Sequence, residues 1–184
     1  MDQKIAILGI LHCPHRYQLI QPWTDGFDLS YVVNSGDAAH ESAANGVCFD
    51  LTQEEPVYVS LDYIAEHDGT RSTLLLAENL QATAWVVPAR SAVRAGNTFV
   101  WHRTAYPAAK INSARANDER PPDDLTYARP SSGHGGGANV VFCDGHYQFI
   151  AEDIDYDVYR QLMTPNSAES DDPVKKVVSD RDYQ

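Results

Sequence analysis

The sequence is poor in positive charge. Only 14 lysines and arginines stand against 26 aspartates and glutamates, so the formal net charge is −12. Nucleic acids and anionic membrane surfaces attract proteins that carry clusters of basic residues. The charge balance therefore argues against a phosphate backbone as the main partner, and we expect contact with neither nucleic acid nor membrane.

Long hydrophobic runs are also missing. A membrane-spanning helix needs ~20 consecutive apolar residues, and no stretch of this chain approaches that length. The run from Ile5 to Leu11 is too short even for the apolar region of a secretory signal. As written, the chain has no export signal, and we expect a cytoplasmic location for it.

Cysteine is scarce as well. Cys13, Cys48 and Cys143 form an odd set without a Cys-x-x-Cys motif. This argues against a disulfide framework and against a cysteine-rich zinc site. Two interpretations stay open: a bridge between Cys13 and Cys48, or three small buried thiols.

The length and the pattern of apolar residues favour one α+β domain. A chain of 184 residues can bury a core without metal or disulfide staples. We expect the domain to span residues 1–165, followed by a polar, mobile tail over residues 166–184. Helices are predicted over residues 60–67, where Leu61, Ile64 and Ala65 would face the core, and over residues 153–163. The expected sheet is mainly antiparallel, with strands over residues 4–11, 28–34, 47–51, 73–76, 83–87, 99–102 and 139–150.

The firmest local feature is a β-hairpin over residues 139–150. Asp144-Gly145 separates two runs of β-branched and aromatic residues, and Asp-Gly is typical of a two-residue type I′ turn. Such a turn would place Cys143 opposite His146. Because side chains alternate along a strand, the expected core face carries Val140, Phe142, Tyr147 and Phe149.

Several catalytic motifs are incomplete. His134 to Gly137 reads His-Gly-Gly-Gly, as in some oxyanion loops, but no Gly-x-Ser-x-Gly elbow accompanies it. The aspartates at 153, 155 and 157 lack the glycine and the distal glutamate of a calcium loop. Glu78 ends a predicted strand, and we favour a structural carboxylate that accepts hydrogen bonds from a neighbouring loop over a catalytic one.

A metal site is the better-supported chemistry. His134, Asp144 and His146 would converge near one end of the hairpin if the glycine-rich loop folds back, and His102 is a candidate ligand from outside it. The ion would be zinc or calcium. The alternative is an Asp-Gly turn beside a histidine that hydrogen-bonds to the backbone.

The same residues carry a family resemblance. His134, nine intervening residues and Asp144-Gly145 resemble the signature of the bacterial prepilin-type processing-associated domain, with His134, Asn139, Asp144 and Gly145 as signature residues. The similar blocks upstream are Leu11 to Pro14, Leu29 to Gly36, Ser60 to Ile64, His67 to Thr70, Leu74 to Asn79 and Val100 to His102. Those downstream are Glu152 to Tyr156 and Leu162 to Pro165.

The resemblance implies a protein related to type IV pilins and type II secretion pseudopilins. Members of this family carry a mostly β head outside the cytoplasmic membrane, so it also implies a cell-envelope location and other copies or secretion components as partners. As written, the chain has no counterpart of their N-terminal leader and long apolar helix. We therefore expect a truncated or free-standing version of such a head.

Two functions follow from different classes of protein. The first is a structural, pseudopilin-like head that binds a divalent cation, in which His134 hydrogen-bonds across the turn around Asp144. The second is a divalent-metal-dependent hydrolase of esters or phosphoesters, in which a metal-bound water attacks the substrate. The missing helix motivates the second function, because a free-standing domain needs another role.

Overall fold

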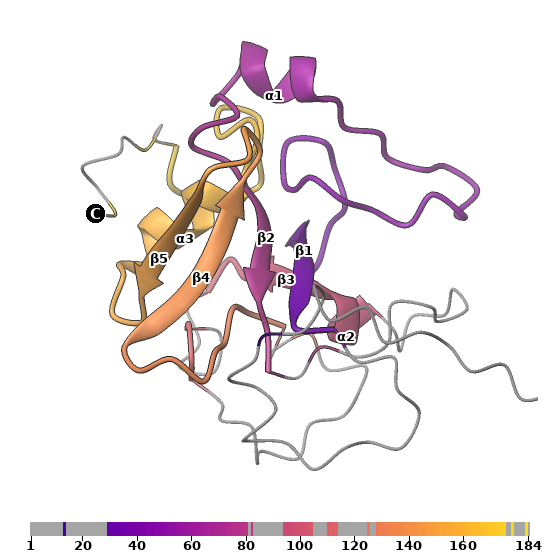
Figure 1. Ribbon diagram of the computed structural model, residues 1–184. Coiled ribbons are helices and arrows are strands. Elements are labelled where there is room, and N and C mark those ends of the chain that lie inside the picture. Colours follow the sequence, from indigo (N-terminus) through magenta and orange to yellow (C-terminus); the bar gives the residue numbers. More distant parts are fainter. Residues whose placement is uncertain are drawn as a thin grey trace, which may run out of the picture.

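The computed structural model describes residues 13, 29–80, 82, 94–104, 110–113, 125, 128–175, 178 and 183. Within these residues a five-stranded sheet has the strand order β3-β1-β2-β4-β5 (Figure 1). The strands are β1 (Tyr31–Asp37), β2 (Leu74–Glu78), β3 (Thr98–Trp101), β4 (Gly137–Phe142) and β5 (Tyr147–Ala151). The helices are α1 (Leu61–Glu66), α2 (Arg94–Asn97) and α3 (Tyr156–Met163).

The α+β class is confirmed, but the sheet is mixed. Antiparallel pairing joins β1 to β2, β2 to β4 and β4 to β5, whereas β1 and β3 pair in parallel. A parallel pair needs a crossover connection, and here α1, β2 and α2 all lie between the two strands in sequence. Sequence alternation could not reveal this pairing, because it looks the same in both orientations.

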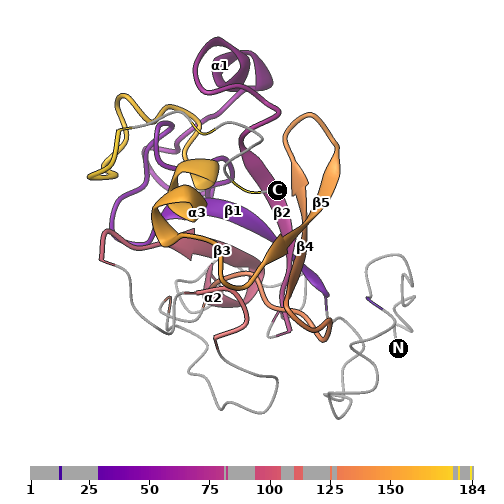
Figure 2. The same cartoon turned by 90° about the vertical axis from the view of Figure 1, so that its left-hand side faces the viewer.

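The core lies between the sheet and α3, which packs over it (Figure 2). Phe99, Trp101 and Phe142 from the strands and Leu162 from α3 are fully buried. Asp155 caps α3, because its side chain accepts a hydrogen bond from the N–H of Asp157. The described part of the chain contains no helix that is both long and apolar enough to cross a membrane.

Both predicted helices form, but their bounds and their buried residues differ from the prediction. In α1 the Ser60 side chain accepts a hydrogen bond from the N–H of Tyr63 at 3.0 Å, as expected of an N-cap. Ile64 is its one buried residue, and Leu61 is 60% exposed. The expected core face of α1 was therefore wrong for Leu61 and Ala65. In the other predicted helix, regular structure begins at Tyr156 rather than Asp153.

The remaining strand predictions have three outcomes. β1, β2 and β3 form close to the predicted ranges, with shifts of one to three residues at their ends. Residues 47–51 are not a strand; the N–H groups of Val47 and Cys48 both donate to the carbonyl of Asn34. The predictions over residues 4–11 and 83–87 lie outside the described residues.

The hairpin forms, but the prediction of its turn was wrong. The N–H of Gly145 donates to the carbonyl of Phe142, and the N–H of Phe142 donates to the carbonyl of His146, both at 2.9 Å. Gly145 has φ 89°, whereas Asp144 does not have a positive φ. A type I′ turn needs positive φ at both positions, so the loop is instead the three-residue kind that ends in a left-handed glycine.

Because this loop is one residue longer than predicted, the opposite face of β5 lies against the core. Val140 pairs with Gln148 rather than with Phe149, and a shift of one residue moves every side chain of a strand to the opposite face. Tyr147 and Phe149 are consequently 80% and 43% exposed, while Ile150 is buried in the core. The expected core face was correct for β4 and wrong for β5.

Packing continues beyond residue 165. Asn166, Ser167 and Asp172 are buried, and the carboxylate of Asp68 accepts hydrogen bonds from the N–H and the hydroxyl of Ser167. The segment that the sequence assigns to a polar tail therefore begins with residues that contact the domain.

Gly137 offers a sharp test of the β4–β5 pairing. A Cβ atom at this position would lie 2.1 Å from the carbonyl oxygen of Ile150, so the two strands would have to separate. We expect Gly137→Ala to lower the free energy of unfolding by about 1–3 kcal/mol, as overpacking usually does, measured by chemical denaturation. Gly135→Ala is the matched control, since a Cβ there has nothing within 4 Å; equal effects of the two substitutions would contradict the pairing.

Candidate metal centre

The four residues predicted to bind metal occupy three separate places. His134 precedes β4, whereas Asp144 and His146 follow it, so the length of β4 lies between them. His102 follows β3, where its N–H donates to the hydroxyl of Tyr156 at 3.0 Å and its Nε2 contacts the carbonyl of Leu125 at 3.2 Å. The structure therefore brings Asp144 and His146 together and leaves the other two elsewhere.

Asp144 and His146 form a compact turn. Oδ1 of Asp144 accepts a hydrogen bond from the N–H of His146 at 3.0 Å and lies 2.5 Å from its Nδ1. The His146 ring stacks on Phe142 with 4.2 Å between the ring centroids. Both hydrogen bonds from His146 favour the ionised carboxylate and lower the pKa of Asp144.

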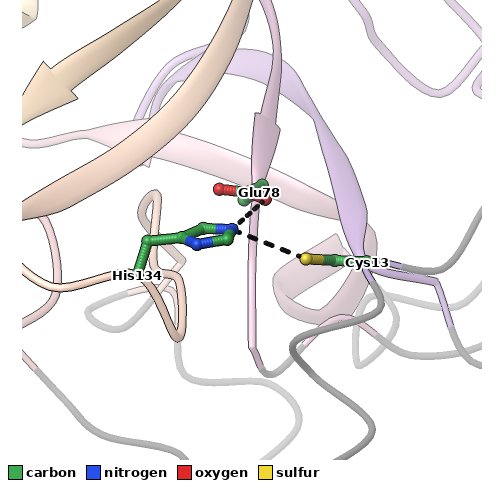
Figure 3. A group of neighbouring side chains, drawn as sticks. All are labelled: Cys13, Glu78 and His134. Carbon is green, nitrogen blue, oxygen red and sulfur yellow. Dashed lines mark hydrogen bonds and ion pairs between the residues drawn. The ribbon is translucent and has the colours of Figure 1, made fainter.

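A different group of potential ligands assembles at the other end of β4. Within the described part of the chain, Cys13, Glu78 and His134 are the three ligating side chains that gather closely enough to hold one ion (Figure 3). Nε2 of His134 lies 3.3 Å from Oε1 of Glu78 and 3.6 Å from Sγ of Cys13. All three ligand atoms lie within 4.8 Å of one another.

Glu78 is held at the end of β2. Its side chain is only 5% exposed, and its Oε2 accepts hydrogen bonds from the N–H and the side-chain amide of Asn139 at 2.8 and 3.0 Å. Its backbone carbonyl accepts another from the N–H of Ser131. The structural role predicted for this carboxylate is thus present, but its donor is a residue of strand β4 rather than of a loop. These bonds leave Oε1 turned toward His134.

The glycine-rich loop positions His134. The hydroxyl of Ser132 accepts a hydrogen bond from the N–H of His134 at 3.1 Å and donates to the carbonyl of Gly137 at 2.6 Å. These bonds close the loop immediately before β4. His134 thus contacts Glu78 and Cys13, and the hypothesis that it hydrogen-bonds across the turn around Asp144 was wrong.

Cys13 reaches the site from the N-terminal side. Its N–H donates to the hydroxyl of Ser30 at 2.8 Å, directly before β1. The adjacent phenol of Tyr31 has a raised pKa, first because it is partly buried and then because Cys13 and Glu78 would repel a phenolate.

All three cysteines are free, so the bridge considered between Cys13 and Cys48 is not formed. Burial raises the pKa of the Cys48 thiol. Burial, reinforced by repulsion from Cys48 and Asp144, raises the pKa of Cys143 to about 12. The second interpretation, three buried thiols, is therefore correct for Cys143, whereas Cys13 and Cys48 are only partly buried.

The geometry does not suit a relay of protons through the imidazole. In a nucleophile–histidine–carboxylate relay the two partners use different ring nitrogens, whereas Cys13 and Glu78 both approach Nε2 of His134. Sequence reasoning missed Cys13 as a partner because 121 positions separate it from His134. Their similar distances from one nitrogen are visible only in the folded chain.

Comparison with known proteins identifies one family. A family model described as "Protein of unknown function (DUF1559)" matches residues 28–157. This range contains all five strands and α1. No curated protein and no solved structure matches the chain.

The Asp144 turn makes a pH-dependent contribution to stability. Because the pKa of Asp144 is lower in the folded chain than its ordinary value of about 3.9, this contribution is present above that value and disappears as the pH falls through the folded pKa. We expect the difference in free energy of unfolding between the wild type and Asp144→Asn to shrink from neutral pH to about pH 3. Denaturation series across this range measure it; a constant difference would contradict the assignment.

Proposed function

We propose that this chain, which belongs to the DUF1559 family, is the head of a pseudopilin-like structural or secretion-associated protein of the cell envelope. The resemblance of its His134-to-Gly145 segment to the prepilin-type processing-associated signature supports this function. Its partners would be further copies of the chain or components of a secretion system.

One observation carries the proposal: the signature residues all make contacts that hold the fold together. Asn139 donates twice to the buried carboxylate of Glu78, and His134 lies against the other oxygen of that carboxylate. Asp144 accepts the N–H of His146, and Gly145 supplies the left-handed residue of the hairpin loop. A segment used in this way fastens a loop and a hairpin to the sheet, which is a structural task.

The fold agrees with this role. A mostly antiparallel sheet packed against one helix is the architecture expected of a mostly β head. The family match extends over the whole sheet. The fold and the family therefore support the proposal over the same part of the chain.

A metal-dependent hydrolase is the weaker candidate. It depends on His102, His134, Asp144 and His146 surrounding one ion, and these residues lie in three places of the described structure. A structural function needs no such convergence. The geometry therefore favours the head over the hydrolase.

The contact between His134 and the buried Glu78 carboxylate, which we call the brace, can be tested by substitution in a buffer that contains a metal chelator. His134→Ala removes the contact to the buried Glu78 carboxylate, and leaving a buried group without its partner costs about 1–3 kcal/mol. We expect a lower melting temperature by calorimetry. The matched control is His40→Ala, whose ring is 60% exposed and pairs with Asp171 at the surface, where such pairs contribute ~1 kcal/mol or less. An unchanged melting temperature for His134→Ala would sink the structural assignment.

The location of the protein tests the wider function. If it is a pseudopilin-like head, antibody detection after fractionation of the native cells should place it with the cell envelope. Recovery in the cytosolic fraction alone, with a cytosolic enzyme as the marker, would refute the proposal.

A further inference from the structure

We propose that Cys13, Glu78 and His134 form a zinc site that joins the N-terminal segment to the sheet. This inference goes beyond the structural role of the head, since none of its function depends on a bound ion. It rests on the arrangement of the three side chains in Figure 3.

The spacing of the ligand atoms fits zinc. In a tetrahedral site with Zn–S of about 2.3 Å and Zn–N and Zn–O of about 2.0 Å, the S···N edge is about 3.5 Å and the N···O edge about 3.3 Å. The corresponding distances are 3.6 Å from Cys13 to His134 and 3.3 Å from His134 to Glu78. Two edges of the group therefore match those of a zinc tetrahedron, and the third, between Cys13 and Glu78, is no longer than 4.8 Å.

Other histidine–carboxylate pairs of the same chain provide an internal comparison. His146 lies 2.5 Å from Asp144, and His40 lies 2.6 Å from Asp171. Direct charge-assisted N–H···O hydrogen bonds are short, at about 2.7–2.9 Å. The 3.3 Å between Nε2 of His134 and Oε1 of Glu78 is longer than such bonds and equals the N···O edge of a zinc tetrahedron.

The chemistry of the ring nitrogen points the same way. Nε2 of His134 carries either one hydrogen or one lone pair, yet it faces both the Glu78 carboxylate and the Cys13 sulfur. A hydrogen on Nε2 can be donated to only one of these two groups, and a lone pair on Nε2 would face the Glu78 carboxylate oxygen with no proton between them. A divalent ion can bind the carboxylate, the imidazole and the thiolate at once.

The ligands are supported by contacts of the kind that orient metal sites. Asn139 occupies Oε2 of Glu78 with two hydrogen bonds and leaves Oε1 for the ion. Ser30 holds the backbone of Cys13, and Ser132 holds the backbone of His134. Each ligand is therefore positioned by a partner that is not itself a ligand.

The donor set selects the metal. Calcium and magnesium prefer oxygen ligands alone, whereas a thiolate and an imidazole with one carboxylate suit zinc. This set disfavours the calcium alternative considered from the sequence. A small pocket lined by Cys13, Glu78 and Ser131 adjoins two of the three ligands, and the fourth ligand of a zinc tetrahedron would be a water molecule.

The ion would connect distant parts of the chain. Cys13 and His134 are 121 positions apart, and closing so long a loop through a metal restricts the unfolded chain strongly. Zinc should therefore raise the melting temperature of the folded protein, and the rise should continue with the logarithm of the free zinc concentration once this exceeds the dissociation constant.

The test uses the full chain stripped of metal with a chelator. Zinc binding is measured by competition with a chromogenic chelator, and cobalt(II) serves as a spectroscopic probe. We expect one zinc per chain, a thiolate-to-cobalt charge-transfer band and the visible bands of tetrahedral cobalt. Absence of stoichiometric zinc, or cobalt binding without the thiolate band, would overturn the proposal.

Matched variants identify the ligands. Cys13→Ser, Glu78→Gln and His134→Gln should each weaken zinc binding by about 100-fold or more, because even an outer-shell partner is worth about 10–100-fold. Cys48→Ser and His146→Gln should bind zinc like the wild type. Equal affinity in Cys13→Ser, or loss of zinc in His146→Gln, would overturn the site. Should Glu78→Gln or His134→Gln fail to fold, Cys13→Ser decides alone, because its thiol lies in a partly exposed position.

The zinc site and the structural role of His134 can be refuted independently of each other. The effect of His134→Ala on stability is measured in chelator, where no zinc contributes. A protein that binds no zinc but still needs His134 for stability would keep the structural function and lose the metal site.

Discussion

The buried carboxylate of Glu78 is the constraint on which this end of the fold depends. A charged group removed from water is costly unless it is paired and hydrogen-bonded. Glu78 meets this requirement only when Asn139 of β4 lies beside it and the loop carrying His134 folds back over it. One side chain thereby fixes the position of a strand, a loop and an imidazole.

Asn34 has the corresponding role farther along the sheet. It is fully buried in β1, and its side-chain amide donates to the carbonyls of Leu74 in β2 and Met163 in α3, both at 2.8 Å. Apolar contacts alone tolerate many arrangements, whereas a buried polar group is satisfied in few. Asn34 and Glu78 therefore help to select one arrangement of strands and helix from those that the apolar residues permit.

The site and the proposed function are compatible. A zinc ion at Cys13, Glu78 and His134 would strengthen the same contact between loop and sheet that the brace already makes. It would also fasten the segment that leads into β1, because Cys13 is already hydrogen-bonded to Ser30 at the start of that strand. A head domain that meets other subunits gains from such fixed surfaces, since ordering them beforehand lowers the entropy lost on assembly.

Local patterns in the sequence determined much of the secondary structure. Ser60 and the aspartates before Tyr156 predicted two helix starts to within a few residues, because an N-cap acts on its own first turn. Asp144-Gly145 predicted a hairpin, but the choice between a two-residue and a three-residue loop depends on how β4 and β5 pack. That choice decided whether Tyr147 or Ile150 entered the core.

The candidate site was likewise predictable from the sequence only in part. The sequence alone singled out His134 and predicted that Glu78 accepts hydrogen bonds, because both lie beside recognisable turns and strand ends, but the donor is Asn139 of β4 rather than a residue of a loop. It could not place Cys13 next to them, since side chains 121 positions apart meet only through the order of the strands. Tertiary structure decided the partners of His134, because the pairing of β2 with β4 sets which groups face its ring nitrogen.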